Sequence, residues 1–153
     1  MILAENKKAH FDYQILQSWE AGLVLAGYEV KAVRAGQISL KESFVVINLN
    51  PKTKRPEARL LNCHINKYQK AGPLPGYDPT RSRRLLLHQK EINSIYGKIQ
   101  PKGLTLLPLR VYTKGTKIKV AIGLGRGKKQ FDKRAATKKR EVDRTLKRKL
   151  KNQ

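Results

Sequence analysis

Apolar residues run together or alternate with polar ones in five short segments of this chain, and each segment is typical of a β-strand. The segments are residues 9–19, 43–49, 58–65, 104–112 and 117–125. In the last segment Ile118, Val120 and Ile122 alternate with lysines and an alanine, which predicts one buried and one partly charged face. The polar stretches at 50–57 and 113–116 predict the turns of two hairpins.

A different spacing follows the first predicted strand and indicates helix. Apolar residues recur there at intervals of four, three, four and three positions: Trp19, Leu23, Ala26, Val30 and Val33. Glycines interrupt this stripe, so we expect two short helices, over 20–26 and 28–34, with a break at Gly27. Another helix is predicted to begin near Lys90 and to end by Gly97.

Several short strands, a few helices and a closing hairpin together predict a fold that is mainly β, with small helices at its periphery. A small antiparallel β-barrel fits this order best, because closure removes the exposed edges of a sheet. The apolar residues concentrate before residue 126. We therefore expect a barrel body over residues 1–125 and a basic tail over residues 126–153.

The chain is strongly basic, with 34 Lys and Arg against 11 Asp and Glu and a net charge of +23 at pH 7. Residues 126–153 hold 13 of these cations and 3 of the acids, so both the body and the tail carry excess positive charge. A chain with such a charge repels itself unless a polyanion neutralises it. The composition therefore indicates that both parts bind a polyanion.

Other features restrict the class of protein. Cys63 is the single cysteine, which excludes an internal disulfide and is typical of a reducing cytosol. The sequence has no apolar run near the ~20 residues that cross a bilayer, and its first residues lack the apolar region of a signal peptide. We expect a cytoplasmic protein that does not associate with membranes.

Residue types that carry catalysis or bind metals do not cluster in the sequence. His10, His64 and His88 are far apart, and no spacing predicts a zinc site. Gly123, Gly125 and Gly127 do not have the spacing of a phosphate-binding loop, and Lys129 stands where that loop has Ser or Thr. They do not match a dinucleotide-binding motif either. We expect no enzyme and no cofactor or metal, although an active site assembled from distant residues stays open.

The segment after the last strand predicts a conditional helix. Gly123, Gly125 and Gly127 predict a flexible exit from the strand. Asp132 can cap a helix, in which Val142 and Leu146 continue one narrow apolar stripe. Neighbouring like charges oppose this helix in free solution, so we expect a tail that is disordered when free and helical on RNA. A permanently disordered tail is the alternative.

The loop predicted over residues 69–84 ends in the sequence DPTRSRRLLL. Arg81, Arg83 and Arg84 follow a proline there and are suited to paired hydrogen bonds with phosphates. The other interpretation is a solvated run of charges without a ligand.

Four sequence blocks point to a known family. NKKAHFDYQI, EAGLVLAGYEVKAVRAG, DPTRSRRLLLHQKEI and GRGKKQFDKR occur in the order and spacing of the bacterial SsrA-binding proteins, also called small protein B. The chain resembles that family from Ala4 to about Arg144.

The resemblance implies binding to transfer-messenger RNA (SsrA) and its delivery to stalled ribosomes, a process called trans-translation. It also implies an antiparallel β-barrel with a topology like that of the oligonucleotide-binding (OB) fold. The body would replace the missing anticodon arm of that RNA, and the tail would probe the empty decoding centre and the mRNA channel, surrounded by rRNA. We expect a monomer bound one to one with the RNA.

The same resemblance assigns residues. In the body it implies RNA contacts at Asn6, Lys7, Glu20 and Leu86. In the tail it implies ribosome contacts at Lys128, Lys129, Asp132, Lys133 and Arg134, and we expect phosphates also around Lys138, Lys139 and Arg140. Phe131 stands where relatives often carry Tyr or His, so it keeps the capacity to stack on a base.

Two other functions remain open from the sequence. One is a general RNA-binding or ribosomal structural protein with an OB-like barrel and a basic extension. The other is an RNA-modifying enzyme, which would need a cofactor cleft that the sequence does not indicate.

Overall fold

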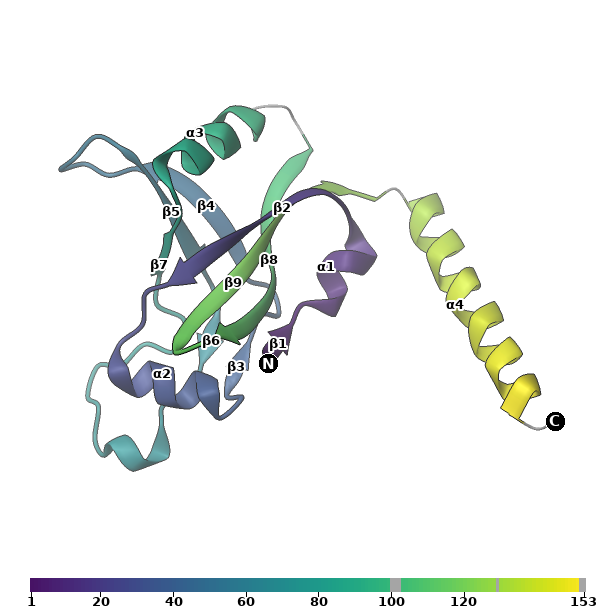
Figure 1. Ribbon diagram of the computed structural model, residues 1–153, viewed down its shortest axis with the longest axis horizontal. Helices are drawn as coiled ribbons and strands as arrows, with labels where there is room; N and C mark the ends of the chain where they lie inside the picture. The colour runs from purple at the N-terminus through teal and green to yellow at the C-terminus, as the bar shows by residue number, and fades with distance from the viewer. Residues whose placement is uncertain (100–102, 129, 152–153) are drawn as a thin grey trace.

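In the computed structural model, which describes residues 1–99, 103–128 and 130–151, antiparallel strands curl into a barrel with helices at its ends and side (Figure 1). The strands are β1 (Ile2–Glu5), β2 (Tyr13–Leu23), β3 (Ile38–Ser39), β4 (Phe44–Leu49), β5 (Pro56–Leu61), β6 (His64–Ile65), β7 (Arg83–Leu86), β8 (Leu104–Lys114) and β9 (Lys117–Gly127). The helices are α1 (Lys7–Asp12), α2 (Gly27–Arg34), α3 (Gln89–Lys98) and α4 (Gln130–Lys151), with a 3-10 turn, η1 (Gln69–Ala71). This confirms the prediction of a mainly β, OB-like fold with small helices.

Within the described residues, six strands close the barrel in the order β8-β4-β5-β7-β2-β9, because β9 pairs with both β2 and β8. One edge of β8 pairs with β9 along its length. The other edge is divided between β4, at Leu106, and β1, from Arg110 to Tyr112. β3 and β6 form a separate pair. Closure leaves few unpaired strand edges among the described residues, as expected for the small barrel predicted from the order of the elements.

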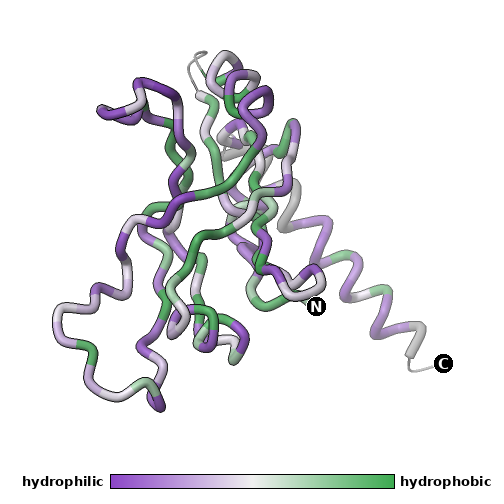
Figure 2. Tube along the Cα trace, turned by 60° about the vertical axis from the view of Figure 1, so that its left-hand side comes forward, coloured by the Kyte–Doolittle hydropathy of each residue, from purple (hydrophilic) through white to green (hydrophobic). Residues whose placement is uncertain are grey.

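Alternate residues of the strands fill the barrel. The fully or nearly fully buried core includes Ala21, Val45, Leu60, Leu85, Val111, Val120 and Ile122. α3 covers one end of the barrel with Ile92 and Ile95, and α2 lies at the other end with Ala32 and Val33 (Figure 1). The Cα trace carries most of its hydrophobic residues in the barrel and few in the C-terminal helix (Figure 2).

α1 covers part of the outer surface of β8 and β9. Ala9 packs there with Leu107, Leu109 and Ala121 in a second, smaller apolar cluster. α1 begins at this point because Asn6 caps it, with its side-chain oxygen accepting the N–H of Ala9 at 3.2 Å. Our prediction of a strand from residue 9 is therefore wrong for residues 9–12.

The predicted helix over 20–26 is also wrong, because β2 continues through Leu23. Ala21 and Leu23 point into the barrel, whereas Glu20 and Gly22 lie on the outer face. The apolar residues with helical spacing come from two elements: Trp19 and Leu23 belong to the end of β2, and Val30 and Val33 belong to α2. The predictions for the helix over 28–34 and for the helix near Lys90 are confirmed.

The glycines near the end of β9 do not form the flexible exit that we predicted. Gly123 and Gly125 lie within the strand, between β2 and β8. A Cβ on Gly123 would lie 2.9 Å from Cδ1 of Leu109, and one on Gly125 would lie 3.1 Å from Cβ of Tyr13. These two glycines therefore allow close packing, and only Gly127, with open space around it, lies at the exit.

α4 leaves the barrel beside α1 and extends away from the strands (Figure 1). Its bounds include the segment that the sequence predicts to be helical on RNA, and its trace is mostly hydrophilic (Figure 2). The loss of this helix in free solution stays a prediction.

Candidate nucleic-acid interface

The strand register gathers several predicted contact residues on the outside of the barrel. Leu86 of β7 lies opposite Gly22 of β2, Gly22 lies opposite Lys119 of β9, and Lys119 lies opposite Tyr112 of β8. Directly opposed residues of antiparallel strands point to the same face of a sheet. Neighbouring pairs extend this surface, which we call the barrel face: Glu20, Gly22, Arg59, Arg84, Leu86, Arg110, Tyr112, Lys114 and Lys119.

Glu20 is held at a fixed place on this face. Its two carboxylate oxygens accept hydrogen bonds from the hydroxyl of Tyr112 and, at 3.2 Å, from Nζ of Lys114. These bonds keep the pKa of Glu20 below its ordinary value of 4.5. Burial and the same hydrogen bond raise the pKa of Tyr112 to about 12. At neutral pH the face therefore presents an oriented carboxylate beside a neutral phenol, with lysines around them.

Leu86 is a large apolar side chain that is 52% exposed. It lies over the bare backbone of Gly22, where an added Cβ would be 3.3 Å from Cβ of Leu86. The missing side chain at Gly22 thus gives Leu86 its position on the barrel face. An exposed leucine next to a carboxylate and several cations is suited to pack against a base or a ribose.

Two arginines continue the barrel face from β7 to β5. Arg84 and Arg59 are opposed across these strands and remain about half exposed. The carboxylate of Glu57 lies between the two guanidiniums, with Oε1 3.7 Å from a nitrogen of Arg84 and Oε2 3.9 Å from a nitrogen of Arg59. One negative charge cannot neutralise both cations. The predicted contact residue Arg84 is therefore available to a phosphate.

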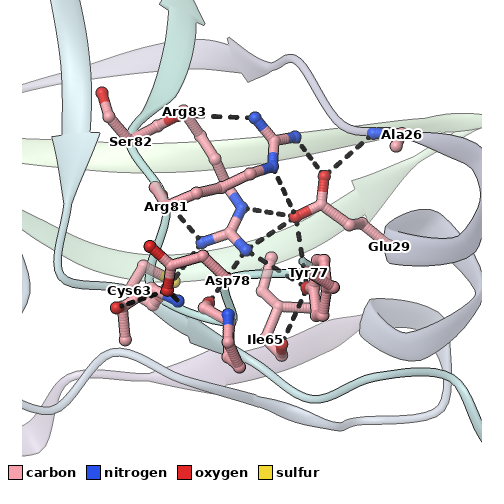
Figure 3. Close-up of polar contacts among 11 residues, drawn as sticks. Ala26, Glu29, Cys63, Ile65, Tyr77, Asp78, Arg81, Ser82 and Arg83 are labelled. Carbon is pink, nitrogen blue, oxygen red and sulfur yellow. Dashed lines mark hydrogen bonds and ion pairs between the residues drawn. The ribbon is translucent and has the colours of Figure 1, made fainter. Parts of the chain in front are cut away.

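Arg83 is different, and the prediction that it binds a phosphate is wrong. Its side chain is fully buried, and its Nε donates to Oε2 of Glu29 at 2.7 Å (Figure 3). Its other nitrogens donate to the carbonyl oxygens of Cys63 at 2.6 Å and Pro79 at 2.9 Å. Because β7 alternates, Arg83 points into the protein while Arg84 points out.

Arg81 shares the buried carboxylate of Glu29 and is 37% exposed, so it has only part of its surface for a ligand. Burial pushes the pKa of Glu29 upward, but hydrogen bonds from Arg81, the N–H of Ala26 and Arg83 outweigh it and leave the pKa below 4.5. The hydroxyl of Tyr77 reaches the same group and donates to the carbonyl of Ile65 at 2.9 Å. Sequence analysis missed Glu29, which fastens α2 to the segment before β7 (Figure 3).

The two predicted residues at α1 have different environments. Asn6 is 8% exposed, and its amide also donates to the carbonyl of Pro108 at 2.9 Å. Its evident role is to hold the start of α1 against β8, and a direct contact with RNA stays a prediction. Lys7 is exposed.

Lys128 ties the tail to the end of α1. Its backbone N–H donates to the carbonyl of Asp12 at 2.8 Å, and its Nζ donates to the carbonyl of His10 at 3.0 Å. A cation suits this position, because the C-terminal carbonyls of a helix carry partial negative charge. The guanidinium of Arg140 lies 5.4 Å from the ring centre of Phe11, so α4 itself also contacts α1.

The other tail predictions divide into two groups. Arg134, Lys138, Lys139 and Arg140 are exposed on α4. Lys129 lies outside the described residues, and Phe131, Asp132 and Lys133 belong to α4 with side chains outside the described part.

The described residues contain neither a candidate metal site nor a membrane-spanning helix. No three His, Cys, Asp or Glu side chains come together in the part of the chain that the structure describes. Over residues 1–99, 103–128 and 130–151, each helix is too short or too polar to span a bilayer.

Barrel, face and tail together define a small basic β-barrel protein with a charged helical extension. The profile of the SmpB protein family matches residues 3–152. The SsrA-binding proteins of Sulfurihydrogenibium sp. and Enterococcus faecalis are 49% and 48% identical, over 98% and 99% of this chain and 97% and 94% of their own lengths. The chain belongs to the SmpB protein family.

A solved chain from "tmRNA-SmpB: a journey to the center of the bacterial ribosome" has the same fold. It aligns with a TM-score of 0.65 and 40% identity, over 87% of this chain and 92% of that one. The relative from Mesoplasma florum is 47% identical over 98% of this chain and is also an SsrA-binding protein. The resemblance stated from the sequence motifs is thereby confirmed at the level of the family.

Proposed function

We propose that this protein binds transfer-messenger RNA and delivers it to stalled ribosomes for trans-translation. The observation that carries the proposal is family membership. The chain aligns over nearly its whole length with relatives that are SsrA-binding proteins. The solved relative is described by the words tmRNA-SmpB and the bacterial ribosome, which supports both partners. The barrel face supplies the chemistry, because exposed cations, an oriented carboxylate and an apolar side chain fit the phosphates, hydroxyls and bases of RNA.

The body and the tail have separate tasks in this proposal. Residues 1–125 bind the RNA through the barrel face and Lys7, and they take the place of a missing anticodon arm. Residues 126–153 enter the empty decoding centre and mRNA channel, where rRNA phosphates neutralise the cations of α4. The protein acts as a monomer, one to each RNA, in the cytoplasm where ribosomes work. It binds and positions its partners and performs no catalysis.

Capture of RNA tests this function directly. The tagged full-length chain is recovered from bacterial cells, and the RNA that it carries is sequenced. Strong enrichment of transfer-messenger RNA over other small RNAs is the expected result. Equal recovery of many structured RNAs would instead favour the alternative of a general RNA-binding or ribosomal structural protein, which the family comparisons do not favour.

A further inference from the structure

The turn between β4 and β5 extends beyond the barrel next to α3 (Figure 1). Lys52, Lys54 and Arg55 lie in this turn, all exposed and without an acidic residue among them. We call these three residues the hairpin tip. Neither the sequence motifs nor the barrel face includes them.

The hairpin tip is held in one shape. The side-chain oxygen of Asn50 accepts the N–H of Lys52 at 2.8 Å, and the backbone carbonyl of Asn50 accepts the N–H of Lys54 at 2.7 Å. Lys54 has a positive φ of 56°, which a non-glycine residue adopts only when its surroundings require it. An ordered turn loses less conformational entropy on binding than a flexible loop of the same charge.

One carboxylate connects the hairpin tip to the barrel face. Oε1 of Glu57 accepts the side-chain N–H of Asn50 at 2.8 Å, and Glu57 also faces Arg59 and Arg84. A hollow of about 210 Å³ lies between the turn, β7 and the start of α3. Arg55 of the tip and Arg84 and Leu86 of the barrel face all line it. The tip and the face are therefore continuous.

We propose that the hairpin tip binds the phosphate backbone of the same transfer-messenger RNA that lies on the barrel face. This inference rests on the proposed function and extends its binding surface by a second group of cations. Phosphate is the partner that the charge, the exposure and the fixed shape of the tip fit. The choice of the RNA over the ribosome follows from the hollow, because it joins the tip to the barrel face, whereas α4 leaves the barrel beside α1 (Figure 1).

The test compares two double variants with equal loss of charge. Lys52→Gln with Lys54→Gln removes cations from the hairpin tip, and Lys67→Gln with Lys70→Gln removes two exposed lysines on the segment around η1. Binding of transfer-messenger RNA is measured from 50 to 200 mM salt. Each lost phosphate contact reduces the steepness of log affinity against log salt by about one. Between 50 and 200 mM salt, the affinity of the tip variant should therefore fall about tenfold less than the affinity of the wild type.

The control variant should keep the wild-type slope to within about half a unit. Equal slopes for the tip variant and the wild type would overturn the inference and leave the proposed function intact, because wild-type binding is measured in the same series. A tip variant that binds the RNA normally but binds empty ribosomes weakly would also overturn it, since the tip would then contact the ribosome. Absence of wild-type binding would refute the proposed function itself.

Discussion

The guanidinium of Arg83 and the carboxylate of Glu29 form an ion pair at 2.6 Å in which neither side chain is exposed to solvent. The pair joins α2 to β7 across 54 positions of sequence. Removing one member of a buried pair leaves the other charge without compensation. Substitution Glu29→Gln should therefore lower the free energy of unfolding by about 3–5 kcal/mol, measured by urea denaturation. The matched variant Glu42→Gln, at an exposed acid, should change it by less than about 0.5 kcal/mol.

The same pair predicts a dependence of stability on pH. The pKa of Glu29 is lower in the folded protein than its ordinary value of 4.5, so the unfolded chain binds the proton more readily. The stabilisation is present above pH 4.5 and is lost as the pH falls through the folded-state pKa. Below pH 4.5 the free energy of unfolding of the wild type should fall more steeply with decreasing pH than that of Glu29→Gln. The difference between the two slopes should be up to about 1.4 kcal/mol per pH unit. Parallel curves for the two proteins would show that Glu29 does not titrate with a lowered pKa.

The glycines of β9 offer a comparison between packing and flexibility. Substitution Gly123→Ala places a Cβ against Leu109 and should lower stability by about 1–3 kcal/mol. Substitution Gly127→Ala meets no neighbour within 4 Å and should leave stability within about 0.5 kcal/mol of the wild type. Thermal unfolding of both variants gives the answer. Equal, small effects would support a flexible exit at both positions.

Glu20 should contribute to RNA affinity more than an ordinary surface acid. A carboxylate on a basic face repels RNA phosphates unless it also accepts a hydrogen bond from a base or a 2′-hydroxyl. Glu20→Gln weakens such a bond, and we expect about tenfold weaker binding of transfer-messenger RNA, or ~1.4 kcal/mol. Glu42→Gln again serves as the control, with unchanged or slightly stronger binding. Normal affinity of Glu20→Gln would remove Glu20 from the interface.

The tail helix can be tested without touching the body. Ala136 lies within α4, and Ala136→Pro should break the helix at a cost of about 3 kcal/mol. Transfer-messenger RNA binding should remain, whereas trans-translation on stalled ribosomes should fail. The control Ala136→Ser keeps the backbone N–H and should support trans-translation. Normal trans-translation by the proline variant would mean that the tail acts as an unstructured polycation.

The free chain should also show little helix from this segment. Clustered like charges and one thin apolar stripe do not offset an ordering cost of about 1–2 kcal/mol per residue. Circular dichroism of the full chain and of a chain ending at Gly127 would therefore differ little in helical signal. A difference equal to a full-length α4 would show that the helix forms without RNA.

The barrel strands were predictable where alternation was strong, as in β9, whose inward residues are all apolar. Around Glu20 and Gly22 the prediction failed because small and polar residues carry little periodicity, and the next helix supplied a misleading one. The start of α1 could have been found, since Asn6 before a helix-forming run is a capping signal. Closure of the barrel depends on pairings between distant strands, which local patterns do not record.

The candidate site was predictable only in part. The family motifs identified Glu20 and Leu86, and the structure explains their proximity through Gly22. The sequence does not indicate which of Arg81, Arg83 and Arg84 points inward, because β7 begins among them. Arg83 is buried because it pairs with Glu29, which lies far away in the sequence and resembles an ordinary surface acid. The sequence does not distinguish the hairpin tip, because its polar residues are typical of any turn.

The attachment of Lys128 to the end of α1 links the direction of the tail to the position of that helix. Two hydrogen bonds fix the first residue after β9, and a helix of 22 residues follows. Such a helix is about 33 Å long, so a rotation of about 10° at its root displaces the far end by roughly 6 Å. Where α4 is helical, a small rotation of α1 against the barrel would thus be magnified at the C-terminal end of α4.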